Sequence, residues 1–292
     1  MNSTNLSNRT AQMKNKSTDN NNTTIKPQTK DITAILTIAG SDCSGGAGIQ
    51  ADLKTFGAHG LFGMSVILSV VAENTSRVIS SYDVPIPCIN EQIEAVFEDI
   101  PPKATKIGML GSQAIIDCIA QNIILYKPKN VVIDPVMFAK NGFPLMPQDI
   151  RQTFKNNILC LADVLTPNIP EAIELCGFEI RNIEDMKKAA ISIYDMGAKS
   201  VLIKGGHSMD NANDIFYNGE FHILESNRID TKNTHGTGCT LSSAIAANLA
   251  LGLDSLEAIK NAKSYVFGAI LHSLNLGKGN GPTNHFYKFN AK

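Results

Sequence analysis

The sequence lacks the features that mark membrane proteins and nucleic-acid binders. It has no run of about eighteen apolar residues that could span a bilayer. Its 26 Lys and Arg are balanced by 27 Asp and Glu, so the basic excess expected of a nucleic-acid binder is missing. With 43% hydrophobic and 18% charged residues over 292 positions, the chain has the composition of an ordinary globular protein with a sizeable core. We therefore expect neither a membrane nor a nucleic acid as partner.

Cysteine motifs are missing as well. The six cysteines form no CxxC pair and no Cys/His ligand spacing, and most lie in apolar stretches. This pattern indicates neither a disulfide framework nor a zinc site, and it favours reduced thiols in a cytoplasmic protein. The positions are Cys43, Cys88, Cys118, Cys160, Cys176 and Cys239.

The first thirty residues have almost no apolar content. Such a segment cannot bury enough surface to offset the entropy lost on ordering, so we expect residues 1–30 to be a disordered tail. It has no apolar core of a secretion signal, and a single arginine, Arg9, makes a weak case for a transit peptide. Residues 31–292 are expected to form one domain.

From residue 34 onward, short apolar runs alternate with helical patterns. The runs are continuously hydrophobic rather than alternating, which is typical of strands covered on both faces. The rhythm predicts an α/β fold with a mostly parallel sheet. Strands are expected at 34–40, 64–72, 104–110, 130–136, 162–168 and 200–206, and helices at 47–59, 90–100, 112–126, 147–158, 170–176 and 184–196.

The pattern changes late in the chain. Residues 214–224 predict a hairpin that turns at Asn218-Gly219, a strong two-residue turn signal. Two helices are expected after it, at 239–252 and 255–273.

A glycine-rich loop, "GSDCSGGAGIQADLKT" (40–55), follows the first predicted strand. It is no Walker P-loop, since GxxxxGK[ST] is missing. Residues 46–51 do fit the G-x-G-x-x-G/A dinucleotide fingerprint, and Glu73 ends the next strand 22 residues later, where a ribose-binding acid is expected. An NAD-dependent oxidoreductase is thus one alternative. The extra residues before the match count against it, because the fingerprint has a tight strand-to-helix turn.

A second glycine loop, "NTHGTGC" (233–239), opens an alanine-rich helix. Successive amides at a helix N-terminus can hold an oxyanion or phosphate. The alternative is a tight turn in which Cys239 is only a small core residue.

Two further strand ends carry polar residues. Asn168 and Glu171 follow one strand, and Lys204 follows another. A carboxylate at this position can hold hydrated Mg²⁺, and lysine can contact nucleotide phosphates. Glu171 could equally be a first-turn helix acid, and Lys204 a solvated loop residue. Their joint occurrence at strand ends, where open α/β sheets bind ligands, favours a site.

Together these motifs resemble the hydroxymethylpyrimidine/phosphomethylpyrimidine kinases of thiamin biosynthesis, in the ribokinase superfamily. The resemblance covers about residues 33–288. It implies a three-layer α/β/α fold, usually dimeric, which uses ATP and Mg²⁺ to phosphorylate 4-amino-5-hydroxymethyl-2-methylpyrimidine and then its monophosphate. The stretches that carry it are "LTIAGSDCSGGAGIQADLKTF" (36–56), "TKIGML" (105–110), "DPVMFAKNG" (134–142), "TPNIPEA" (166–172), "KGGH" (204–207), "NTHGTGCTLSSAIAA" (233–247) and "GKGNGP" (277–282).

The resemblance also implies roles for single residues. Cys239 holds the place of the catalytic aspartate of sugar kinases, behind an anion hole formed by Gly236, Thr237 and Gly238. Asn168 and Glu171 resemble the Mg²⁺-phosphate motif, with Glu171 toward the metal, and Lys204 resembles a nucleotide contact. Glu73, Gly40, Asp42 and Met109 are the expected substrate-binding residues, although Asp42 could instead cap its own turn.

This chain departs from the family pattern at three positions. Cys43 replaces a proline, an exchange within a loop. Glu73 replaces a glutamine, and a carboxylate only accepts hydrogen bonds whereas an amide also donates. We therefore expect Glu73 either to pair with a protonated pyrimidine ring or to be protonated itself by burial. Ala139 lies where some pyridoxal kinases of the same branch have a second cysteine, which favours the pyrimidine substrate and leaves pyridoxal or pyridoxine as the alternative.

Two residues of the second loop carry chemical expectations. A helix N-terminus lowers a thiol pKa, so Cys239 is predicted to be a reactive thiol that accepts the hydroxymethyl proton. His235 either steadies the loop, approaches phosphate, or is a solvated turn residue.

Overall fold

The computed structural model describes residues 31–139, 142–206 and 212–289. The expected disordered tail, residues 1–30, lies outside the described residues, and so does His207 of the "KGGH" stretch. The described residues from Ile32 onward group into one unit by their internal contacts.

Within the described residues, nine strands form one sheet in the order β3-β2-β1-β4-β5-β6-β7-β8-β9. The pairs from β2 through β1, β4, β5 and β6 to β7 are parallel, and antiparallel pairs occur only at the two edges. The predicted mostly parallel sheet is confirmed. The strands are β1 Ala34–Asp42, β2 Phe62–Glu73, β3 Val78–Asp83, β4 Thr105–Ile107, β5 Val131–Ile133, β6 Val164–Leu165, β7 Val201–Ile203, β8 Asp214–Tyr217 and β9 Phe221–Leu224.

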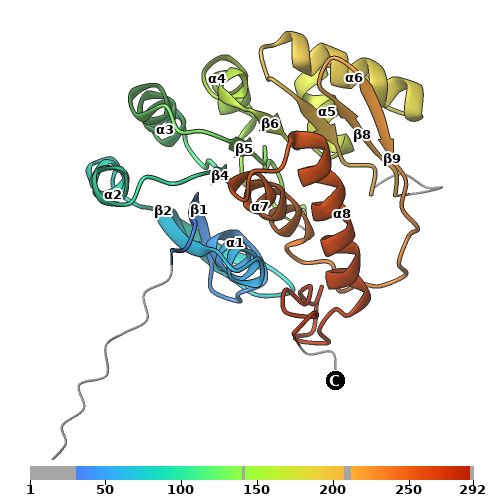
Figure 1. Ribbon diagram of the computed structural model, residues 1–292, viewed down its shortest axis with the longest axis horizontal. Helices are drawn as coiled ribbons and strands as arrows, with labels where there is room; N and C mark the ends of the chain where they lie inside the picture. Colours follow the sequence, from blue (N-terminus) through green and yellow to red (C-terminus); the bar gives the residue numbers. More distant parts are fainter. Residues whose placement is uncertain (1–30, 140–141, 207–211, 290–292) are drawn as a thin grey trace, which may run out of the picture. The chain divides into compact units, whose positions relative to one another are not determined.

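Helices cover both faces of this sheet, which completes the three-layer α/β/α arrangement (Figure 1). Helices α2 to α6 pack on one face, and α1, α7 and α8 pack on the other. Their bounds are α1 Gly48–Ala58, α2 Ile86–Asp99, α3 Gln113–Tyr126, α4 Arg151–Asn157, α5 Ile169–Cys176, α6 Ile183–Asp195, α7 Thr237–Ala250 and α8 Ser255–Leu271, with short 3₁₀ turns at Gln148–Ile150 and Leu159–Leu161.

The continuous apolar runs of the central strands are explained by these two layers. In β5, Val131 and Ile133 join the core beneath α2 to α6, while Val132 between them joins the core beneath α7 and α8. Successive side chains of a strand point to opposite faces, so a strand covered on both sides favours apolar residues at successive positions.

The two edges of the sheet differ in how well the sequence predicted them. The hairpin of β8 and β9 is antiparallel as expected, with Gly219 at the turn in the left-handed region (φ 101°). Strand β3 was not predicted. Its residues are mostly exposed and polar, so it lacks the apolar run by which the inner strands were found.

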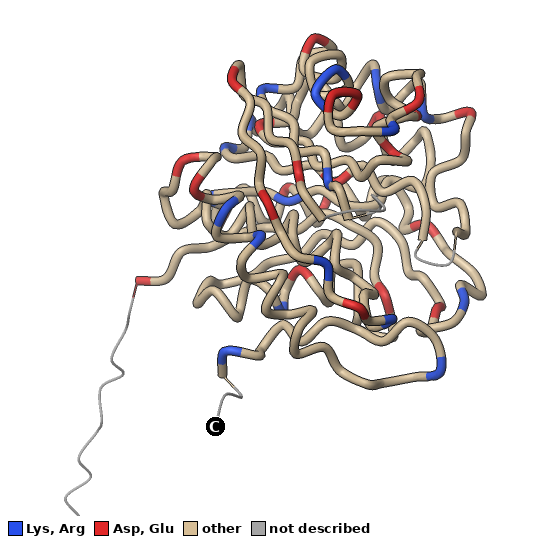
Figure 2. Tube along the Cα trace, turned by 90° about the vertical axis from the view of Figure 1, so that its right-hand side faces the viewer, with Lys and Arg blue, Asp and Glu red and all other residues tan. Residues whose placement is uncertain are grey.

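The surface charges agree with the balanced composition, and the cysteines do so only in part. Acidic and basic residues are interspersed along the described trace, and neither sign gathers on one face in this view (Figure 2). None of the described helices combines the length and apolar character that a membrane crossing requires. All six cysteines are free thiols, but Cys43, Cys88 and Cys160 are exposed, so fewer lie in apolar surroundings than the sequence suggested.

Candidate active site

Every residue predicted for the site lines one cavity of about 790 Å³. Because β1, β2, β4, β5, β6 and β7 run parallel, their carboxyl ends meet at one edge of the sheet, and the cavity lies at that edge. Its lining includes the predicted catalytic, substrate, nucleotide and metal positions, namely Gly40, Asp42, Glu73, Met109, Asn168, Glu171, Lys204, Gly236, Thr237, Gly238 and Cys239.

The N-terminus of α7 has the form of an anion hole. Gly236 is its N-cap residue, in the left-handed region at φ 77°, and the helix begins at Thr237. The Thr237 amide donates weakly to the Thr234 carbonyl at 3.3 Å, whereas no partner is found for the amides of Gly238 and Cys239 among the described residues. Two free N–H donors at the positive end of a fourteen-residue helix can receive a phosphate oxygen.

Two glycine loops meet at this point, and their contact explains the glycines. A Cβ on Gly236 would overlap the carbonyl oxygen of Gly46, and a Cβ on Gly46 would overlap the ring of His235. The loop after β1 and the loop before α7 therefore pack backbone against backbone, which only glycine permits.

Asp42 joins the same two loops. Its carboxylate accepts hydrogen bonds from the amides of Ser44, Gly46 and Ala47 at 2.7 to 3.0 Å, and from Nε2 of His235 at 2.9 Å. Burial by itself would raise the pKa of Asp42, but these hydrogen bonds outweigh it and hold the pKa well below its usual range. Asp42 thus caps its own turn, the alternative role for this residue, and His235 is a buried loop contact rather than a solvated one.

Glu73 ends β2 beside this pair. One carboxylate oxygen each of Asp42 and Glu73 and one ring nitrogen of His235 all lie within 4.8 Å of one another. Burial, and then the negative charge of Asp42, raise the pKa of Glu73 to about 7, although His235 opposes the shift. Burial therefore shifts the pKa of Glu73 upward, in the direction expected from the sequence.

Gly40 and Glu73 both coincide with irregularities of the sheet. The β1–β2 register shifts between Ala39 and Ser41, and the β2–β3 register shifts between Ala72 and Glu73. Such bulges are common next to active sites because they redirect a side chain. A Cβ on Gly40 would come within 2.8 Å of Met109 Cε, so the glycine leaves room for this methionine in the cavity wall.

Asn168 and Glu171 form a capping box at the start of α5. Asn168 Oδ1 accepts from the Glu171 amide at 2.9 Å, and Glu171 Oε2 accepts from the Asn168 amide at 2.8 Å. Glu171 is only 3% exposed, and burial raises its pKa to about 7 despite the opposing charge of Lys204. Glu171 is therefore an acid of the first helical turn, as one alternative held, and it also lines the cavity.

Lys204 is not a solvated loop residue. Its ammonium donates to Asp134 Oδ1 at 2.7 Å and lies 3.9 Å from Glu171 Oε2. Burial would lower the pKa of Lys204, but Asp134 and Glu171 raise it, so the ammonium stays charged within the cavity wall.

Sequence reasoning missed three charged residues of this site: Asp134, Lys106 and Asp52. All three are almost fully buried, and Asp52 pairs with Lys106 at 2.8 Å. Asp134 and Lys106 lay within stretches already singled out, "DPVMFAKNG" and "TKIGML"; Asp134 directly follows β5, and Lys106 is a charged residue inside β4. A charged residue inside or directly after a buried strand was the signal that could have found these two.

The thiol of Cys239 differs from its prediction. The helix N-terminus was expected to lower its pKa, but burial raises the pKa to about 11, and Asp52 and Asp134 add to that rise. Lys106 and the Gly48 amide act in the opposite direction without reversing it. The prediction of a lowered pKa was wrong because desolvation of the half-buried sulfur outweighs the helix end.

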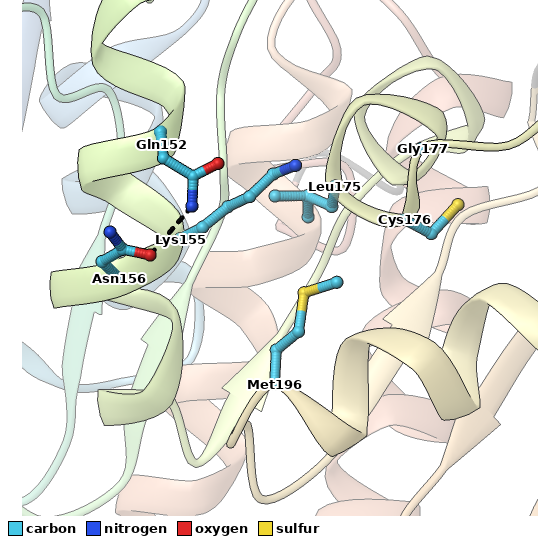
Figure 3. A pocket seen from close by; sticks show the side chains of 7 residues that line it. All are labelled: Gln152, Lys155, Asn156, Leu175, Cys176, Gly177 and Met196. Carbon is cyan, nitrogen blue, oxygen red and sulfur yellow. Dashed lines mark hydrogen bonds between the residues drawn. The ribbon is translucent and has the colours of Figure 1, made fainter.

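A second cavity, of about 560 Å³, lies away from these residues, between α4 and the ends of α5 and α6 (Figure 3). Its wall carries Lys155 and Cys176 but none of the residues predicted for the site. The chemistry therefore concentrates in the larger cavity.

With this geometry in place, comparison with known proteins assigns the family. The family model for phosphomethylpyrimidine kinase matches residues 42–284. The chain belongs to this family. A hydroxymethylpyrimidine/phosphomethylpyrimidine kinase of Haemophilus influenzae is 45% identical over 263 residues, which are 88% of this chain and 97% of that protein.

Solved structures agree with membership of the phosphomethylpyrimidine kinase family. A phosphomethylpyrimidine kinase of Clostridium difficile superimposes with a TM-score of 0.74 at 47% identity, covering 82% of this chain and 99% of that one. An ADP complex of Bacillus subtilis pyridoxal kinase has a TM-score of 0.83 at 40% identity, covering 89% and 100%. The family is one of phosphotransferases, so the NAD-dependent oxidoreductase alternative was wrong: the glycine loop after β1 packs on the loop before α7 instead.

Proposed function

We propose that this protein is an ATP-dependent kinase that phosphorylates 4-amino-5-hydroxymethyl-2-methylpyrimidine and then phosphorylates the monophosphate to the diphosphate. One observation carries this proposal in particular. Glu73, the expected pyrimidine contact, lines the same cavity as Cys239 and the free amides at the start of α7. A substrate bound against Glu73 would present its hydroxymethyl group to the place where phosphate is held.

In the transfer step, the hydroxymethyl oxygen attacks the γ-phosphorus of ATP. The O–H bond breaks and its proton passes to the sulfur of Cys239, which must be in its thiolate form and becomes the neutral thiol. The new O–P bond forms, and the bond to the β-phosphate oxygen breaks so that ADP leaves. Phosphoryl transfer proceeds through a loose transition state, so positioning and charge stabilisation dominate. The amides of Gly238 and Cys239 would stabilise the transferred group.

The carboxylates of Glu171 and Asp134 fit Mg²⁺. Both are hard oxygen donors, buried at 3% and 2% exposure, and both line the cavity beside Lys204. Mg²⁺ prefers one or two carboxylates together with substrate phosphates, and when bound it would neutralise phosphate charge. Lys204 would then contact the nucleotide phosphates as a point charge.

Glu73 would hydrogen-bond the pyrimidine in its protonated, neutral form. A protonated carboxyl both donates and accepts, as the glutamine of related kinases does. Its pKa of about 7 leaves a large protonated fraction at neutral pH.

The assembly and location belong to the same proposal. Family resemblance supports a homodimer, and the unpaired state of all six thiols supports the cytoplasm. Sedimentation velocity would test the dimer.

A pyridoxal or pyridoxine kinase is the second candidate. The 40% identity to Bacillus subtilis pyridoxal kinase over 89% of the chain favours including these alcohols as substrates. The decisive assay incubates purified protein with Mg-ATP and, separately, the hydroxymethylpyrimidine, its monophosphate, pyridoxal and pyridoxine, and follows ADP and phosphorylated product. Product from the pyrimidines at the highest kcat/KM is expected. No ATP-dependent product with any of them would refute the kinase.

A further inference from the structure

Two buried ion pairs flank the start of α7. Lys204 and Asp134 form one at 2.7 Å, which the proposed function uses to bind ATP. Lys106 and Asp52 form the other at 2.8 Å, with no exposed surface on either side chain. A buried ion pair contributes little net stability, since desolvating both charges offsets their attraction. The second pair therefore calls for a role beyond stability.

Asp52, on α1, anchors this pair between two helices and two strands. Its Oδ1 accepts from Ser243 at 2.6 Å, and its Oδ2 accepts from Thr37 at 2.6 Å as well as from Lys106. These bonds leave the carboxylate no freedom to turn, so the position of the Lys106 ammonium is determined.

The same two helices hold Cys239. Ser243 lies four residues after Cys239 on α7, and Asp52 lies four residues after Gly48 on α1. Residues four apart share a helix face. The Gly48 amide is near enough to the Cys239 sulfur to lower its pKa, and Ser243 donates to Asp52 one turn further on, so α1 and α7 face each other along these two turns. The ion pair thus lies one turn beneath the thiol.

The Lys106 ammonium has donors to spare. Of its three N–H bonds, one reaches Asp52, and no further hydrogen bond of this ammonium is found among the described residues. Lys106 and Cys239 line the same cavity. Gly108 leaves room for the ammonium, because a Cβ there would come within 2.8 Å of Lys106 Nζ.

We propose that Lys106, oriented by Asp52, is a positioning residue that stabilises the negatively charged sulfur of Cys239. The proposal rests on the proposed function in one respect, the role of Cys239 as proton acceptor. Burial removes the water that would otherwise stabilise a negatively charged sulfur, and the positive charge of Lys106 compensates for that loss. Asp52 keeps this charge in place.

The charges around the sulfur give opposite predictions for the two partners. Lys106 and Lys204 carry positive charge toward Cys239, and Asp52 and Asp134 carry negative charge. Removing the charge of Lys106 leaves Asp52 to disfavour the thiolate. Removing the charge of Asp52 leaves the positive charge of Lys106 uncompensated, and this favours the thiolate of Cys239.

The test measures the alkylation rate of Cys239 by iodoacetamide at pH 8.5 in the full-length protein, resolved by mass spectrometry of its peptide. Alkylation follows the thiolate fraction, which changes about tenfold per pKa unit. Lys106→Met is expected to slow the reaction of Cys239 by about tenfold or more, and Asp52→Asn to accelerate it. The exposed Cys43 and Cys88 serve as internal references, and Lys103→Met, an exposed lysine near the same strand, as the matched control with no change expected.

Damage to packing would move both variants in the same direction, so equal slowing, or no change in either, overturns the proposal. If Lys106→Met does not fold, Asp52→Asn and the double variant Lys106→Met/Asp52→Asn decide. The proposal then requires that Cys239 is alkylated faster in Asp52→Asn than in the wild type. It also requires that Cys239 is alkylated more slowly in the double variant than in Asp52→Asn. Opposite shifts without kinase activity would refute the proposed function alone. Kinase activity without opposite shifts would refute the role of Lys106 alone.

Discussion

Asp42 and His235 lie 193 residues apart in the chain, yet the histidine Nε2 contacts the aspartate Oδ2 at 2.9 Å inside the protein. This bond ties the turn that begins α1 to the loop that begins α7. The same Oδ2 accepts the amides of Gly46 and Ala47. One buried carboxylate therefore sets the distance between the two glycine loops.

Replacing this carboxylate should weaken the protein in a pH-dependent way. Asp42→Asn is expected to cost about 1–3 kcal/mol of unfolding free energy at pH 7, because it loses charge-assisted hydrogen bonds. The pKa of Asp42 is lowered in the folded state, so its contribution is fully present above the unfolded pKa and is lost as the pH falls. Urea unfolding from pH 7 to pH 3 should show the difference between wild type and variant shrinking toward the acid end. A difference independent of pH would contradict this.

Cys239→Ala tests the proton acceptor. We expect kcat to fall by 10²- to 10⁴-fold, as general-base removal typically gives, with little change in the KM for ATP. Cys239→Ser separates steric from acid–base effects. A loss smaller than about tenfold would reduce Cys239 to a positioning role.

Glu73→Gln tests recognition of the pyrimidine. With its pKa raised to about 7, wild-type Glu73 is protonated below that pH and becomes an acceptor-only carboxylate above it. The KM for the pyrimidine should therefore rise between pH 6 and pH 8.5 in the wild type and stay flat in the variant. Parallel profiles would exclude both a titrating Glu73 and a protonated ring as its partner.

Gly236→Ala tests the contact between the loops. Gly236 has φ 77°, and a Cβ there would overlap the Gly46 carbonyl, so we expect a loss of at least about 2 kcal/mol in unfolding free energy and most of the activity. Gly57→Ala is the control, because Gly57 lies inside α1 with no atom within 4 Å of the added carbon. That variant should be as stable as the wild type or more so. Equal effects of the two substitutions would refute the packing explanation.

Prediction from sequence succeeded where a pattern repeats along the chain and failed where it does not. The inner strands were found because they lie in largely apolar runs, and the helix after "HGTGC" because its alanine-rich run is long. Strand β3 was missed because its exposed residues owe their conformation to pairing with β2. Asp52 was missed because its partners, Thr37, Lys106 and Ser243, come from three distant segments.

The sequence by itself determined the α/β layering, the strand ends that carry the site, and the family, since all of these depend on local periodicity and on motifs read in order. Only the tertiary structure decided the protonation of the site. The pKa of Cys239 moves up rather than down, and that of Glu73 moves to about 7, because burial and charges from distant segments act on each. Desolvation and Coulomb interactions depend on distances in space, which the order of residues does not state.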